Sequence, residues 1–92
     1  FLPAGDSLIE LITPITEESG VAKYLAKRGE GIHHICLEVD DVEAALAEMK
    51  AKGAQLIDDQ TIQAAEGRAF FLHPKGTHGV LIELLEADKE TR

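Results

Sequence analysis

Hydrophobic and polar residues alternate near the start of the chain and then change to helical spacing. The alternation over Ser7 to Thr13 predicts a strand, which Pro14 ends. Ser19 to Arg28 then has apolar residues on one side, as expected for a short helix. Ser19 is suited to cap this helix and Gly29 to stop it. This part of the chain therefore predicts a strand followed by a helix.

The clearest strand pattern is Ile32 to Val39. Alternate positions are apolar on one face, while the other face carries His34, Cys36 and Glu38. A helix follows at once, with Asp40 suited to the N-cap and Glu43 to a capping box. Gly53 ends this helix. Its buried stripe at helical spacing consists of Val42, Ala45, Leu46 and Met49.

Further strands are predicted after the second helix: Gln55 to Ile57, Arg68 to Leu72 and Val80 to Leu85. A long polar loop, Asp58 to Gly67, separates the first of these from the second, and Ala87 to Arg92 are expected to form a frayed tail. From Ile32 onward the order is strand, helix, strand, strand, strand. The predicted fold class is therefore α+β, with a βαβββ module.

A short internal repeat links the first predicted strand to the last. The matching segments are Ser7-Leu8-Ile9-Glu10-Leu11 and Val80-Leu81-Ile82-Glu83-Leu84. Each carries one Glu in the same apolar setting, as a duplicated module would. We interpret Ser7 to Thr13 as the last strand of another copy of the module. Because no earlier strands of that copy precede it, we expect the sequence to be part of a longer protein.

Charge and composition exclude several classes of partner. Nine Lys and Arg residues against 17 Asp and Glu residues give a net charge of −8, which argues against nucleic acid or an anionic membrane. No apolar run reaches transmembrane length, and no signal peptide is visible. Cys36 is the single cysteine and cannot form an internal disulfide, which favours a reducing compartment.

Glu10, Glu83 and His34 are the residues to which we assign chemistry. A carboxylate inside an apolar strand is costly unless it is paired, hydrogen-bonded or bound to a metal. A lone Glu is usually exposed and a lone His usually structural, but the two Glu residues share one context. If the first and last strands of the module are neighbours, His34 and Glu83 lie side by side in one cleft. Imidazole and carboxylate suit Zn²⁺, Co²⁺, Mn²⁺ or Fe²⁺.

Several runs resemble the methylmalonyl-CoA epimerases of the vicinal-oxygen-chelate superfamily. The segment that opens their second module is similar to Gly31-Ile32-His33-His34-Ile35-Cys36-Leu37-Glu38-Val39-Asp40-Asp41. Their closing segment is similar to Phe71-Leu72-His73-Pro74-Lys75 followed by His78-Gly79-Val80-Leu81-Ile82-Glu83-Leu84. The last strand of their first module is similar to Ser7-Leu8-Ile9-Glu10-Leu11-Ile12. The His-His-Ile pattern is shared with glyoxalase I, whereas Phe-Leu-His-Pro-Lys is more specific to the epimerases.

The resemblance implies paired βαβββ modules whose sheets curve round a metal ion. Residues 1–14 would be the last strand of a truncated first module, and residues 15–30 a linking helix. Residues 31–87 would form the second module, and residues 88–92 a tail. His34 and Glu83 would be metal ligands from the second module, and Glu10 the ligand from the last strand of the first. Some members have Gln at the position of Glu10. The family's remaining His ligand and its other acid/base glutamate have no counterpart in this sequence.

The implied activity is that of an isomerase that interconverts the (R) and (S) forms of methylmalonyl-CoA. The proton next to the thioester carbonyl would be removed through a metal-stabilised enolate, with Glu83 as a catalytic acid/base residue. The expected cofactor is a divalent metal ion, with Co²⁺ favoured and Zn²⁺, Mn²⁺ or Ni²⁺ as alternatives. Lys75 or Arg68 would supply positive charge for the CoA tail of the acyl-CoA substrate.

The resemblance also implies a homodimer that acts in propionate metabolism, in the cytoplasm or, in a eukaryote, in the mitochondrial matrix. Two other functions remain open. One is a glyoxalase I-like lyase of the same superfamily. The other is a non-catalytic, drug-sequestering binding module, which should lack the ligand set formed by Glu10, His34 and Glu83.

Overall fold

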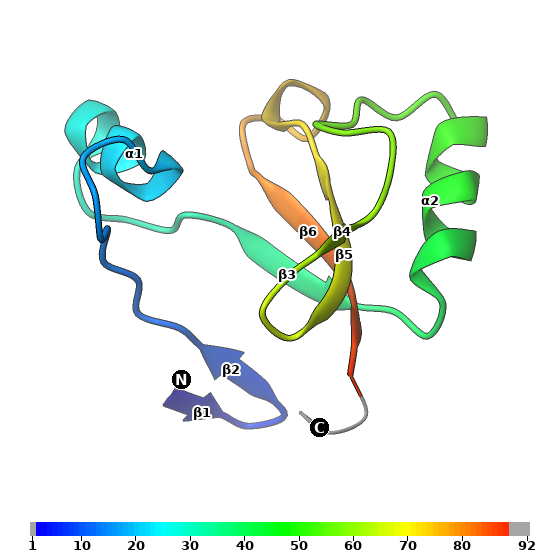
Figure 1. Ribbon diagram of the computed structural model, residues 1–92, viewed down its shortest axis with the longest axis horizontal. Helices are drawn as coiled ribbons and strands as arrows, with labels where there is room; N and C mark the ends of the chain where they lie inside the picture. The colour runs from blue at the N-terminus through cyan, green and yellow to red at the C-terminus, as the bar shows by residue number, and fades with distance from the viewer. Residues whose placement is uncertain (1, 89–92) are drawn as a thin grey trace. The chain divides into compact units, whose positions relative to one another are not determined.

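The computed structural model describes residues 2–88, which belong to two compact units, Phe1–His33 and His34–Arg92 (Figure 1). The first unit contains β1 (Leu2–Ala4), β2 (Ser7–Ile9) and α1 (Gly20–Arg28). The second contains β3 (Ile35–Glu38), α2 (Val42–Ala51), β4 (Ile62–Gln63), β5 (Gly67–Leu72), the 3₁₀ helix η1 (Pro74–Gly76) and β6 (Ile82–Ala87).

Helix α1 begins and ends where the sequence predicts. The Ser19 side chain accepts a hydrogen bond from the backbone N–H of Ala22 at 3.1 Å, which satisfies one of the unpaired donors of the first turn. Gly29 has a φ of 73° and its N–H donates to the Leu25 carbonyl at 2.8 Å, which closes the last turn. No helix within residues 2–88 is long and apolar enough to cross a membrane.

The strand predicted over Ser7 to Thr13 is wrong in its length. β2 ends at Ile9 and forms an antiparallel hairpin with β1, which the sequence did not predict. The ladder ends where Ile9 pairs with Leu2, the first described residue. Glu10 therefore follows the strand instead of lying within it, and it is solvent-exposed.

The second unit is a four-stranded sheet in the order β3-β6-β5-β4, with α2 packed on one face (Figure 1). β3 and β6 are parallel, and the other neighbouring strands are antiparallel. The core lies between α2 and the sheet and consists of Val42, Leu46, Phe70 and Leu84. The α+β class, the βαβββ order and the buried stripe of the helix are confirmed. Because α2 packs on β5 and β6, Ile35 and Leu37 on the outer strand stay 46% and 52% exposed.

The predicted N-cap of α2 is wrong by one residue. The backbone N–H of Val39 still pairs with the Leu85 carbonyl of β6, so the strand pairing extends to the position before Asp40. Asp41 is the cap, and its carboxylate accepts from the Ala44 N–H at 3.1 Å. The Glu43 carboxylate accepts a hydrogen bond from the Thr61 hydroxyl instead of closing a capping box.

The segment predicted as a short strand and a long loop forms an interrupted edge of the sheet. Only Leu56, opposite Leu72, makes a bridge within the predicted strand Gln55 to Ile57, and β4 lies inside the predicted loop. Both Leu56 and β4 pair with β5, and the residues between them leave the sheet edge. This excursion places Thr61 next to α2.

The last strand is shifted toward the C-terminus from the predicted Val80 to Leu85. The N–H groups of Gly79 and Val80 bond to the carbonyls of Pro74 and Thr77, so these residues belong to the turn after η1. β6 instead continues to Ala87, which pairs with Gly67 and was predicted to be in the tail. The Asp88 N–H donates to the Glu66 carbonyl, and the remaining residues of the predicted tail, 89–92, lie outside the described residues.

Candidate functional site

The structure brings the side chains of His34 and Glu83 together. The Nε2 atom of His34 lies 3.1 Å from Oε1 of Glu83. The two side chains are 18% and 8% exposed. His34 directly precedes β3 instead of lying within it as predicted, because the pairing with β6 starts when the Ile35 N–H donates to the Leu81 carbonyl. His34 is only one residue before β3, and β3 and β6 are neighbours, so its imidazole still reaches the Glu83 carboxylate.

Strand alternation explains why Glu83 points away from α2. Ile82 and Leu84 pack in or against the core under the helix, so the intervening side chain projects from the opposite face of the sheet. Cys36 of β3 and Phe71 of β5 are the cross-strand partners of Glu83, one on each side. The Phe71 ring also meets the His34 ring edge-on, with centroids 6.0 Å apart and an interplanar angle of 68°.

The surroundings of Glu83 suppress ionisation of the neighbouring thiol. Burial, the negative charge of Glu83 and a hydrogen bond with the Glu83 side chain raise the pKa of Cys36 to about 12. Glu66 and Glu38 add weaker contributions of the same sign. Cys36 is exposed as a whole residue. With this raised pKa its thiol is nevertheless protonated at neutral pH, which argues against a nucleophilic role.

The His34–Glu83 pair fits half of a metal site. An imidazole nitrogen and a carboxylate oxygen are the donors that Zn²⁺ and related divalent ions take in proteins, and here they share one face. Within residues 2–88, no group of three or more His, Cys, Asp or Glu side chains is arranged to hold a metal ion. Glu10, the remaining predicted ligand, belongs to the first unit. A complete site therefore needs ligands beyond this pair.

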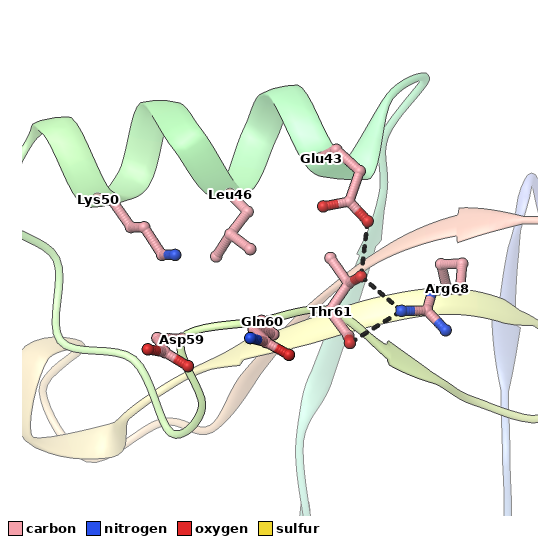
Figure 2. Close-up of a pocket in the computed structure, with 7 residues that line it drawn as sticks. All are labelled: Glu43, Leu46, Lys50, Asp59, Gln60, Thr61 and Arg68. Carbon is pink, nitrogen blue, oxygen red and sulfur yellow. Dashed lines mark hydrogen bonds between the residues drawn. The ribbon is translucent and has the colours of Figure 1, made fainter.

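A separate cavity of about 320 Å³ lies on the other face of the sheet, beside α2 (Figure 2). Figure 2 shows Thr61 between Glu43 and Arg68: its hydroxyl donates to Glu43 Oε2 at 2.7 Å and accepts from Arg68 Nη2 at 2.8 Å. The same nitrogen of Arg68 donates to the Thr61 carbonyl at 2.9 Å. Arg68 thus ties α2 to the sheet, and the prediction that it binds a CoA tail has no support in this geometry.

The sequence did not identify Cys36 and Phe71 as the cross-strand neighbours of Glu83. The alternation did place Cys36 on the face of His34, but the alternation alone does not identify its neighbour on the next strand. Phe71 belongs to a run that is hydrophobic throughout, so only the pairing of β5 with β6 distinguishes it from Phe70, which is buried in the core.

Comparison with known proteins decides the family. The model described as the glyoxalase/bleomycin resistance protein/dioxygenase superfamily matches residues 1–72. The chain belongs to this superfamily. The predicted resemblance to the methylmalonyl-CoA epimerases is also confirmed, because human mitochondrial methylmalonyl-CoA epimerase is 38% identical over 95% of this chain and 51% of its own length.

Two solved structures share the fold of this chain, and one of them is a methylmalonyl-CoA epimerase. A hypothetical protein from Bacillus halodurans superposes with a TM-score of 0.90 at 43% identity, over 95% of this chain and 64% of its own. A Streptomyces coelicolor methylmalonyl-CoA epimerase variant in complex with 2-nitronate-propionyl-CoA superposes with a TM-score of 0.77 at 44% identity, over 83% of this chain and 54% of its own. This chain spans about half the length of the human relative that it matches.

Proposed function

We propose that this chain is part of a divalent-metal-dependent epimerase that inverts carbon 2 of methylmalonyl-CoA. The observation that carries the proposal is the close pair of His34 and Glu83, held on one face of the sheet by neighbouring strands. The similarity to human methylmalonyl-CoA epimerase supports the choice of reaction within the superfamily. The Streptomyces relative supports the substrate class, since its ligand is an acyl-CoA with an anionic group on carbon 2.

His34 and Glu83 would hold the metal ion, and Glu10 would join them in the full-length protein. The fourth ligand would be a histidine outside the sequence described here. A bound divalent ion would supply a Lewis acid for the negative charge that develops when carbon 2 loses its proton. The resemblance to the epimerases favours Co²⁺ among the candidate ions. Zn²⁺, Mn²⁺ and Ni²⁺ are alternatives, because a donor set of nitrogen and oxygen accepts all of them.

Glu83 would also act on the proton at carbon 2. Its carboxylate is almost fully buried and lies 3.1 Å from Nε2 of His34, so it has a fixed place in the site. A positioned general base contributes about 10²–10⁴-fold to a proton transfer. Inversion needs a second acid/base group on the opposite face of the substrate, and we assign it to a glutamate outside this sequence.

Assembly and location are further parts of the proposal. A homodimer agrees with the exposed apolar side chains Ile35 and Leu37 on the outer strand β3. A reducing compartment, the cytoplasm or the mitochondrial matrix, agrees with the unpaired Cys36. Sedimentation of the full-length protein tests the first of these, and fractionation of the source cells tests the second.

The test of the function is epimerisation by the full-length protein with and without metal. We expect one epimer of methylmalonyl-CoA to be converted to a mixture of both, with loss of activity on chelation and recovery on addition of Co²⁺. His34→Ala and Glu10→Ala should each weaken metal binding. Unchanged turnover after removal of all metal would overturn the metal-dependent reaction, and conversion of the hemithioacetal of methylglyoxal alone would identify a glyoxalase.

A further inference from the structure

We propose that Phe71 is a positioning residue for the His34–Glu83 pair. Its ring fixes the plane of the His34 imidazole so that Nε2 faces Glu83. The inference rests on the proposed function, because it concerns how the two metal-binding side chains are held. The Phe71 ring meets the His34 ring, the Phe71 backbone pairs with Glu83, and a phenyl ring has no hydrogen-bond donor or acceptor.

The backbone of Phe71 is held from both sides. On one side Phe71 is the antiparallel cross-strand partner of Glu83 in β6. On the other side its carbonyl accepts a hydrogen bond from the Ile57 N–H at 3.1 Å, next to the bridge between Leu56 and Leu72. A residue paired in this way has a fixed Cα–Cβ direction. The direction in which the Phe71 side chain leaves the sheet is therefore fixed.

His34 lies just outside β3, one residue before the strand begins. The Phe71 and His34 rings meet at 68° with centroids 6.0 Å apart, which is the edge-to-face geometry that aromatic rings prefer. An imidazole held in this plane keeps Nε2 at 3.1 Å from Glu83 Oε1. Since the phenyl ring offers no hydrogen bond, it constrains the imidazole without competing for Nε2.

The expected effect follows from the size of one edge-to-face contact. Phe71→Leu removes the edge-to-face contact with the imidazole, which should weaken metal affinity by about three- to tenfold. Phe71→Tyr keeps the ring and should restore wild-type affinity. Phe70→Leu is the matched control, because Phe70 is the adjacent residue, is 1% exposed and packs in the core on the opposite face.

The experiment uses the full-length protein loaded with Co²⁺ and follows the d–d absorption of the metal, its affinity and the thermal unfolding of each variant. We expect the spectrum and affinity to change in Phe71→Leu and to be retained in Phe71→Tyr. Phe70→Leu should lower the unfolding temperature and leave the spectrum unchanged. On the Zn²⁺-loaded wild type, nuclear Overhauser effects should connect the ring protons of Phe71 and His34.

Three results would overturn the inference: no such Overhauser effects in the wild type, a wild-type spectrum and affinity in Phe71→Leu, or the same spectral change in Phe70→Leu. Should Phe71→Leu not fold, the Overhauser measurement decides. If the wild type neither binds a divalent ion nor epimerises methylmalonyl-CoA, the proposed function itself fails. If it does both and Phe71→Leu is unaltered, only the role of Phe71 is refuted.

Discussion

Replacing Glu83 by glutamine should separate activity from stability. Glutamine has nearly the same shape, and its Oε1 can still accept a hydrogen bond from His34 Nε2, so the 3.1 Å contact can persist. The free energy of unfolding of the metal-free protein should therefore stay within about 1 kcal/mol of wild type. Turnover should fall by about 10²–10⁴-fold, because the amide is a poor metal ligand and cannot accept the proton from carbon 2.

Glu86→Gln is the matched control, three residues along the same strand. Glu86 Oε1 accepts a hydrogen bond from the Val42 N–H at 2.9 Å and so places a negative charge at the N-terminus of α2. Loss of that charge should cost about 0.3–1 kcal/mol of stability and leave turnover unchanged. The assay compares initial epimerisation rates at saturating metal with denaturant unfolding after chelation. Near wild-type turnover in metal-loaded Glu83→Gln, or an equal loss in Glu86→Gln, would refute the reasoning.

Other outcomes follow from single contacts. Thr61→Val should cost about 1–3 kcal/mol in denaturant unfolding with turnover unchanged, because Arg68 loses the acceptor at 2.8 Å. Gly67→Ala should cost more than about 2 kcal/mol, since at a φ of +155° a Cβ would lie 2.1 Å from the Glu86 carbonyl oxygen. With the pKa of Cys36 raised from 9.0 to about 12, alkylation at pH 8 should be roughly 10²–10³-fold slower in chelated native protein than in unfolded protein. The same difference means that stability is lost as pH rises from 9.0 toward 12, because the unfolded thiol releases its proton first.

Local signals in the sequence were sufficient to predict the helices. The caps of α1 at Ser19 and Gly29 depend on hydrogen bonds within a few residues, and both were predicted. The strand limits depend on partners far along the chain and were less accurate. β6 continues to Ala87 because that residue pairs with Gly67 of β5, and it begins only after the turn around η1 has used the N–H groups of Gly79 and Val80.

The pair at the centre of the site could be predicted because it needs only alternation and one assumption about topology. Once the first and last strands of the module are neighbours, His34 and Glu83 must share a face. The contact with Phe71 could not be predicted, since it depends on the register between β5 and β6. The relation of Glu10 to this pair stays a prediction, because Glu10 belongs to the other unit.

Exchange of the proton at carbon 2 with solvent would show whether the protein carries out the proposed proton transfer. Methylmalonyl-CoA of a single configuration would be incubated in D₂O with the metal-loaded full-length protein and followed by proton NMR. We expect deuterium to replace the proton at carbon 2, both epimers to form, chelation to stop the exchange, and Glu83→Gln to stop the formation of the second epimer. Retention of that proton by the metal-loaded wild-type protein would contradict the proposed proton transfer.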